Sequence, residues 1–137
     1  MIKRVIFVSR SKAENSFGST DCAVISISEP SGFFGFADLK EGFYEVLRSE
    51  FDDVDPATCS DQSNKFMTMH QARVIATFVD SVAPEVNLIM VHCKAGISRS
   101  AAVAKWIAER YGLPFDHHYK SYNAHVYKLL DSLEALS

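Results

Sequence analysis

A cysteine and an arginine six positions apart are the residues of this sequence best suited to chemistry. Cys93 carries a thiol that becomes a strong nucleophile once it is ionised, and Arg99 can grip an oxyanion through two parallel hydrogen bonds. The segment between them is short and has Gly96 at its centre. Together these residues could attack and hold an anionic ester.

The residues around the 93–99 loop predict how it is held. An apolar run, 88–91, leads into it, and a helix-forming run, 101–107, leads out. A strand that ends in a loop and opens a helix directs several backbone N–H groups toward one point, which creates a cradle for an anion. The helix N-terminus and Arg99 should also lower the pKa of the Cys93 thiol.

These features predict a site that cleaves a phosphate ester through a cysteine-bound intermediate. Ser100 is placed to give a hydrogen bond to the sulfur, and His92 should have a supporting role because its side chain points away from that of Cys93 in a pleated strand. The phosphate should be bound by Lys94, Ala95, Gly96, Ile97, Ser98 and Arg99.

Strands that alternate with helices predict the fold class. Apolar and β-branched runs indicate strands, and apolar residues at helical spacing indicate helices. We expect an α/β fold, with a central, mainly parallel sheet of four to five strands flanked by helices, in a single domain over residues 1–137. The expected strands are 2–8, 22–28, 44–51 and 87–91, and the expected helices are 66–83, 100–111 and 123–136.

Composition narrows the class of partner. The chain has 137 residues, 47% hydrophobic and 23% charged, with a net charge of −3, which argues against nucleic acid or an anionic membrane as its main partner. No apolar run approaches the length of about 20 residues that a membrane span needs. Three cysteines without a CxxC pair fit a reducing cytoplasm. We expect a cytoplasmic monomer that needs no cofactor and no metal, with His117 and His118 in a surface turn.

The segment 92–100 resembles the signature of the cysteine-dependent protein tyrosine phosphatases, His-Cys, five residues, then Arg-Ser or Arg-Thr. Every fixed position is matched, and the sequence is most similar in plan to the small dual-specificity-like branch. The matched positions are His92, Cys93, Gly96, Arg99 and Ser100. The resemblance implies a metal-free reaction in two steps, in which a phosphocysteine forms and is then hydrolysed.

The resemblance also implies a general acid on a loop 30–40 residues before the cysteine; two aspartates fit best, and Asp52 and Asp55 are further alternatives. Asp61 lies 32 positions before Cys93, whereas Asp53 lies 40 positions before it and follows Phe51 at an expected strand end. We favour Asp53, because its place at the end of a strand should survive insertions in the loop. Asn123 is similar to an asparagine that supports the active-site loop in this family, although the usual neighbouring proline is missing.

Other functions remain open at this stage. A sulfurtransferase or arsenate reductase also uses a cysteine in an anion-binding loop, and a non-catalytic phosphate-binding module would need the loop alone. The substrate would be a phosphorylated protein or a small phosphomonoester. The loop has one basic residue, Lys94, with Ile97 where lipid-directed relatives place a second, which disfavours an inositide.

Overall fold

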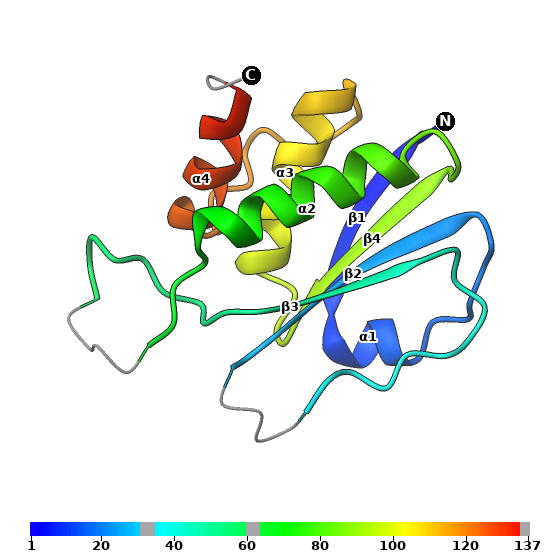
Figure 1. Ribbon diagram of the computed structural model, residues 1–137, viewed down its shortest axis with the longest axis horizontal. Helices are drawn as coiled ribbons and strands as arrows, with labels where there is room; N and C mark the ends of the chain where they lie inside the picture. The colour runs from blue at the N-terminus through cyan, green and yellow to red at the C-terminus, as the bar shows by residue number, and fades with distance from the viewer. Residues whose placement is uncertain (31–34, 60–63, 135–137) are drawn as a thin grey trace.

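A four-stranded, wholly parallel sheet forms the centre of the molecule (Figure 1). The computed structural model describes residues 1–30, 35–59 and 64–134. Strands β1 (Arg4–Ser9), β2 (Cys22–Ser28), β3 (Val46–Glu50) and β4 (Leu88–Cys93) lie in the order β1-β4-β2-β3. The expected α/β class with a parallel sheet is confirmed, with four strands in the described part of the chain.

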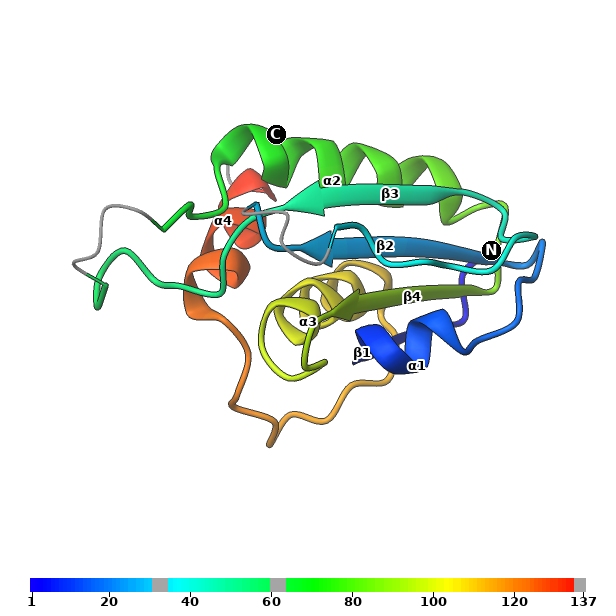
Figure 2. The same cartoon turned by 90° about the horizontal axis from the view of Figure 1, so that it is seen from below.

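Three helices lie on one side of this sheet, and one short helix lies on the other (Figures 1 and 2). Helices α2 (Met69–Val82), α3 (Arg99–Tyr111) and α4 (Ala124–Glu134) form the thick layer. Helix α1 (Arg10–Glu14) follows β1 directly on the opposite side.

The alternation of side chains along the strands divides the core in two. On β2, Ala23, Ile25 and Ile27 face the main core under the three helices, whereas Cys22 and Val24 face α1. The same alternation on β4 sends Cys93 to the helix-covered face and His92 to the other face. The strand pleat thus separates the two side chains, as the sequence predicts.

The helix ends follow from local sequence signals. Thr68 and Gln71 form a reciprocal capping box at the start of α2, and Gly112, with a φ of 65°, ends α3 in the left-handed conformation. Val126 donates its N–H to Oδ1 of Asn123 at 3.0 Å, which caps α4.

Most element boundaries differ from expectation by a few residues, and α2 begins at Met69 rather than at residue 66. Strand β3 begins at Val46 rather than at residue 44, and α1 is not predicted by the sequence pattern. A helix of five residues is too short to show apolar periodicity, and its signal is limited to the cap that Ser9 gives to the N–H of Lys12 at 3.2 Å. No helix within the described residues has the length and apolar character needed to span a membrane.

Candidate active site

The carboxyl ends of all four strands meet at one edge of the sheet, and the candidate site lies there. Because the strands are parallel, their ends converge on the 93–99 loop that follows β4. Glu29 follows β2, Phe51 follows β3, and Arg10 follows β1. The topology therefore brings together residues that are far apart in the sequence.

The 93–99 loop is held tightly against the end of β1. Gly96 has a φ of 71°, and a Cβ atom there would lie 2.3 Å from the backbone nitrogen of Ser9. The N–H of Arg10 donates to the carbonyl of Lys94 at 3.2 Å, and the N–H of Asn123 donates to the carbonyl of Ser98 at 3.1 Å. Only glycine fits this close approach, and the carbonyls of the loop are held from outside it.

The thiol of Cys93 is buried and lies beside the hydroxyl of Ser100, with Sγ and Oγ 3.1 Å apart. Burial opposes ionisation, but it is outweighed by hydrogen bonds from the Ser100 hydroxyl and from the N–H groups of Ser100 and Gly96, together with the charge of Arg99. The pKa of Cys93 is therefore lower than its ordinary value. This arrangement favours the thiolate, which is the nucleophilic form.

Arg99 is almost completely buried at the base of the loop. Its Nη1 donates to the carbonyl of Phe51 at 2.8 Å, and its Nη2 donates to Oε1 of Glu29 at 2.7 Å. The third guanidinium nitrogen, Nε, is buried and has no hydrogen-bond partner among the described residues. A buried N–H without an acceptor is costly, so an anion held in the loop would offer the acceptor that it lacks.

Asp53 stands at the rim of the same loop. Its Oδ1 accepts hydrogen bonds from the hydroxyl of Ser98 at 2.7 Å and from Nδ2 of Asn123 at 2.8 Å. The side chain is exposed, so the carboxylate faces both the loop and solvent. Asp61 lies outside the described residues. Asp52 accepts the N–H of Lys65 at 2.8 Å and so fastens the two ends of the loop that carries Asp53.

His92 forms a side-chain hydrogen bond with the neighbouring strand. Its Nε2 lies 2.7 Å from the hydroxyl of Ser26 on β2, on the face opposite to Cys93. Burial is the main reason that the pKa of His92 falls to about 4. The histidine is therefore neutral near pH 7 and adds no positive charge there, so its support consists of joining β4 to β2.

The outer residues of the loop are open to ligand. Lys94, Ala95 and Ile97 are exposed. Lys94 also lines a cavity of about 320 Å³ with Arg10, Glu14 and Glu29, beside the mouth of the loop. Among the described residues, no hydrogen bond is formed by the backbone N–H groups of Ala95, Ile97 and Ser98. The structure thus brings the predicted phosphate-binding residues into one loop with donors still to be satisfied.

Sequence reasoning missed two partners of Arg99, namely Glu29 and the carbonyl of Phe51. Glu29 could have been predicted from its position immediately after a buried strand. The carboxyl ends of parallel strands lie at the same edge of the sheet, so Glu29 should lie near the loop that follows β4. The missing proline did not prevent Asn123 from reaching the site, since it contacts both Asp53 and the carbonyl of Ser98.

The fold of this chain is similar to that of a tyrosine phosphatase-like protein and to that of DUSP28. Two solved structures carry this comparison, and both are human. The tyrosine phosphatase-like serine/threonine/tyrosine-interacting protein has a TM-score of 0.65 and 18% identity, over 96% of this chain and 91% of its own. DUSP28 has a TM-score of 0.51 and 19% identity, over 97% of this chain and 95% of its own. No protein-family model and no curated protein sequence matches the chain.

Proposed function

We propose that this chain is a phosphomonoester hydrolase of the protein tyrosine or dual-specificity phosphatase type, acting through a phosphocysteine intermediate within a single catalytic domain. The observation that carries the proposal is the pairing of an acidified, buried thiol with a loop of unsatisfied donors. The pKa of Cys93 is lowered by the same loop that holds the unpartnered Nε of Arg99. A thiolate at the floor of an anion cradle is suited to attack at phosphorus.

In the first step, the Cys93 thiolate attacks phosphorus, an S–P bond forms, and the P–O bond to the leaving group breaks. Asp53 gives its proton to the departing oxygen, for which its position at the rim of the loop is suitable. Arg99 and the loop N–H groups hold the equatorial oxygens while charge develops on them. The product is a phosphocysteine and an alcohol or phenol.

In the second step, water attacks the phosphocysteine and the S–P bond breaks. The Asp53 carboxylate takes the proton of the water, and inorganic phosphate leaves. The hydroxyl of Ser100 stabilises the departing thiolate across the 3.1 Å separation from Sγ. The electron pair of the S–P bond returns to sulfur, so the thiolate is ready for the next cycle.

We further propose a cytoplasmic setting and a phosphorylated protein or small phosphomonoester as substrate. None of the three cysteines, all of which lie within the described residues, forms a disulfide. The reaction requires Cys93 as a thiolate, which a reducing compartment preserves.

The test is hydrolysis of 4-nitrophenyl phosphate in the presence of a metal chelator. We expect turnover by the unaltered protein, loss of at least a thousandfold in Cys93→Ser, and retention in the control Cys59→Ser. Denaturation during turnover should trap phosphate on Cys93. Full activity of Cys93→Ser would disprove the mechanism, and sulfur transfer from thiosulfate to cyanide without phosphatase activity would assign the loop to a sulfurtransferase.

A further inference from the structure

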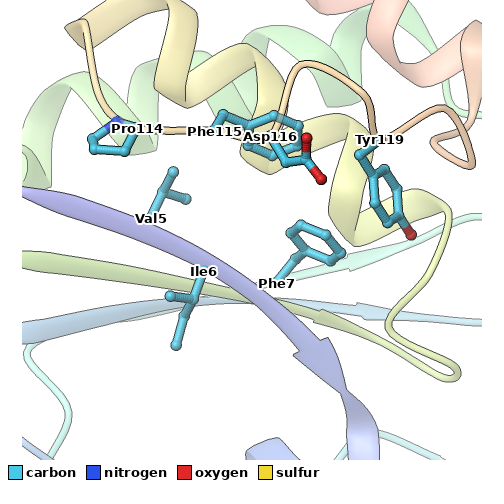
Figure 3. A pocket seen from close by; sticks show the side chains of 7 residues that line it. All are labelled: Val5, Ile6, Phe7, Pro114, Phe115, Asp116 and Tyr119. Carbon is cyan, nitrogen blue, oxygen red and sulfur yellow. The ribbon is translucent and has the colours of Figure 1, made fainter.

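The segment that connects α3 to α4 contacts the 93–99 loop through a tyrosine. Tyr119 donates its hydroxyl to the carbonyl of Ile97, which is one of the exposed residues of the loop. In Figure 3, Tyr119 lies with Phe115 and Asp116 on this connecting segment, opposite Phe7 of β1. The contact joins the loop to a part of the chain that follows it by 22 residues.

This contact has a consequence for the loop backbone because a peptide group is planar and trans. In such a group the carbonyl of one residue and the N–H of the next point in opposite directions. Tyr119 holds the Ile97 carbonyl outward, so the N–H of Ser98 is turned to the inner side of the loop. Among the described residues that N–H has no hydrogen-bond acceptor.

We propose that Tyr119 is a positioning residue of the active site, and that its hydroxyl fixes the peptide between Ile97 and Ser98 so that the Ser98 N–H binds an oxygen of the phosphoryl group. The inference rests on the proposed phosphatase function, since it assigns one donor of that anion cradle. Tyr119 itself contacts the loop and not the reacting atoms.

The tyrosine ring is well held for this role. It packs edge-on against Phe7, with ring centroids 5.1 Å apart, and against Phe115 at 6.5 Å. Phe7 is paired in register with Val91, two residues before Cys93. Rigid strand residues therefore fix the ring, and the ring fixes the loop. Figure 3 shows Phe7, Phe115 and Tyr119 among the side chains that line a pocket. The volume of this pocket is about 270 Å³.

The loop is held in the same way at neighbouring points. The carbonyl of Lys94 accepts from the N–H of Arg10, and the carbonyl of Ser98 accepts from the N–H of Asn123. Tyr119 holds a third carbonyl of the loop, that of Ile97, through its side chain instead of a backbone N–H. Partial burial, and then the negative charge of Cys93, raise the pKa of Tyr119, so the hydroxyl keeps the proton that the bond to Ile97 requires.

The experiment compares Tyr119→Phe with the matched control Tyr122→Phe. Tyr122 belongs to the same connecting segment but packs against Tyr127 of α4 instead of the loop. Binding of inorganic phosphate is measured by calorimetry, which does not require turnover, and the steady-state constants are measured with 4-nitrophenyl phosphate. A second variant is Phe7→Leu. It leaves the Tyr119 hydroxyl in place but removes the aromatic ring against which Tyr119 packs.

We expect Tyr119→Phe to weaken phosphate binding about tenfold and to lower kcat/KM by a similar factor. The effect should be smaller than the hundredfold or more typical when a donor to the oxyanion is removed, because the Ser98 N–H remains. Phe7→Leu should weaken phosphate binding less, and Tyr122→Phe should match the unaltered protein. The pH midpoint for alkylation of Cys93 by iodoacetamide should not move, since the donors to Sγ are Ser100 and Gly96.

Two results would overturn the inference while leaving the phosphatase proposal intact. One is phosphate binding by Tyr119→Phe that equals that of Tyr122→Phe. The other is a weakened binding accompanied by a shifted alkylation midpoint, which would indicate general collapse of the loop. Failure of the unaltered protein both to bind phosphate and to hydrolyse the ester would instead remove the proposed function, and this inference with it.

Discussion

Glu29 and Arg99 form an ion pair of 2.7 Å between Oε1 and Nη2, at a sequence separation of 70 residues. The pair fixes the guanidinium from the side of β2, while the carbonyl of Phe51 fixes it from the side of β3. Arg99 is thereby oriented before any ligand arrives, which reduces the ordering that phosphate binding requires.

The orientation of Arg99 can be tested through Glu29. Glu29→Ala should raise KM for an aryl phosphate about tenfold and lower the free energy of unfolding by about 1–2 kcal/mol, because a buried donor loses its acceptor. Glu29→Gln, which retains a carbonyl acceptor, should fall between Glu29→Ala and the unaltered protein. Equal KM values for all three proteins would show that Phe51 alone positions the guanidinium.

The same ion pair predicts a dependence of stability on pH. Burial would raise the pKa of Glu29, but the hydrogen bond and charge of Arg99 outweigh it, so the pKa falls below 4.5. A lowered carboxyl pKa stabilises the fold above about pH 4.5, and this contribution is lost as pH falls through the folded-state pKa. The difference in unfolding free energy between the unaltered protein and Glu29→Gln should therefore narrow below pH 4.5 in denaturant titrations.

Ser100 is expected to act on Cys93 in both chemical steps. Ser100→Ala removes a hydrogen bond that lowers the thiol pKa, so the pH midpoint for alkylation by iodoacetamide should rise. Phosphocysteine should also accumulate, because the departing thiolate is less stabilised in the second step. Ser98→Ala, whose hydroxyl contacts Asp53 rather than Sγ, is the control for the midpoint. An unchanged midpoint in Ser100→Ala would contradict this account.

Asp53 is expected to matter most for esters with poor leaving groups. Asp53→Asn should lower kcat about 10²- to 10⁴-fold for an alkyl phosphate, since general acid catalysis is lost. The loss should be much smaller for 4-nitrophenyl phosphate, whose leaving group needs little protonation. Asp55→Asn is a suitable control, because Asp55 instead accepts the N–H of Ala57 in a turn. A leaving-group dependence found in Asp61→Asn and absent in Asp53→Asn would assign the acid to Asp61.

The lowered pKa of His92 predicts a second dependence of stability on pH, in a different pH range. An unfolded histidine takes up a proton near pH 6.5, whereas the buried His92 remains neutral down to about pH 4. The free energy of unfolding should therefore fall between pH 6.5 and 4, by up to about 1.4 kcal/mol per pH unit. His92→Asn should remove this slope, as measured by denaturant titration, and His70→Asn on the exposed side of α2 should not. A slope that persists in His92→Asn would refute the assignment.

Two glycines with similar φ values should respond differently to alanine. At Gly112, with a φ of 65° and open space around the added Cβ, alanine should cost about 1 kcal/mol of stability and leave phosphate affinity unchanged. At Gly96 the added Cβ would meet the backbone of Val8 and Ser9, and phosphate binding should fall more than a hundredfold. Calorimetry with phosphate distinguishes the two, and equal affinities would show that the 93–99 loop tolerates the displacement.

The sequence predicts the strands and the position of the loop after β4 because both have local signals. Strand β2 has its expected bounds, and the loop after β4 follows from one run of adjacent residues. The partners of Arg99 have no such signal, because the contacts of Glu29 and Phe51 depend on strand order. The contact of Tyr119 with the Ile97 carbonyl has no local signal either, because it depends on where the segment between α3 and α4 returns to the loop. The residues of one continuous loop can therefore be identified from sequence, whereas the distant residues that contact the loop cannot.

The long-range origin of the site also links ligand binding to the folding of the whole chain. Arg99 is held by residues 48 and 70 positions away, and Asp53 by Asn123, again 70 positions away. Forming such contacts costs chain entropy, and this cost is offset only when the full sheet and α4 have formed. No short fragment around Cys93 would retain the cradle. Phosphate bound in the 93–99 loop would therefore stabilise the entire fold. At a phosphate concentration of a hundred times its Kd, it would add about 2.7 kcal/mol to the free energy of unfolding.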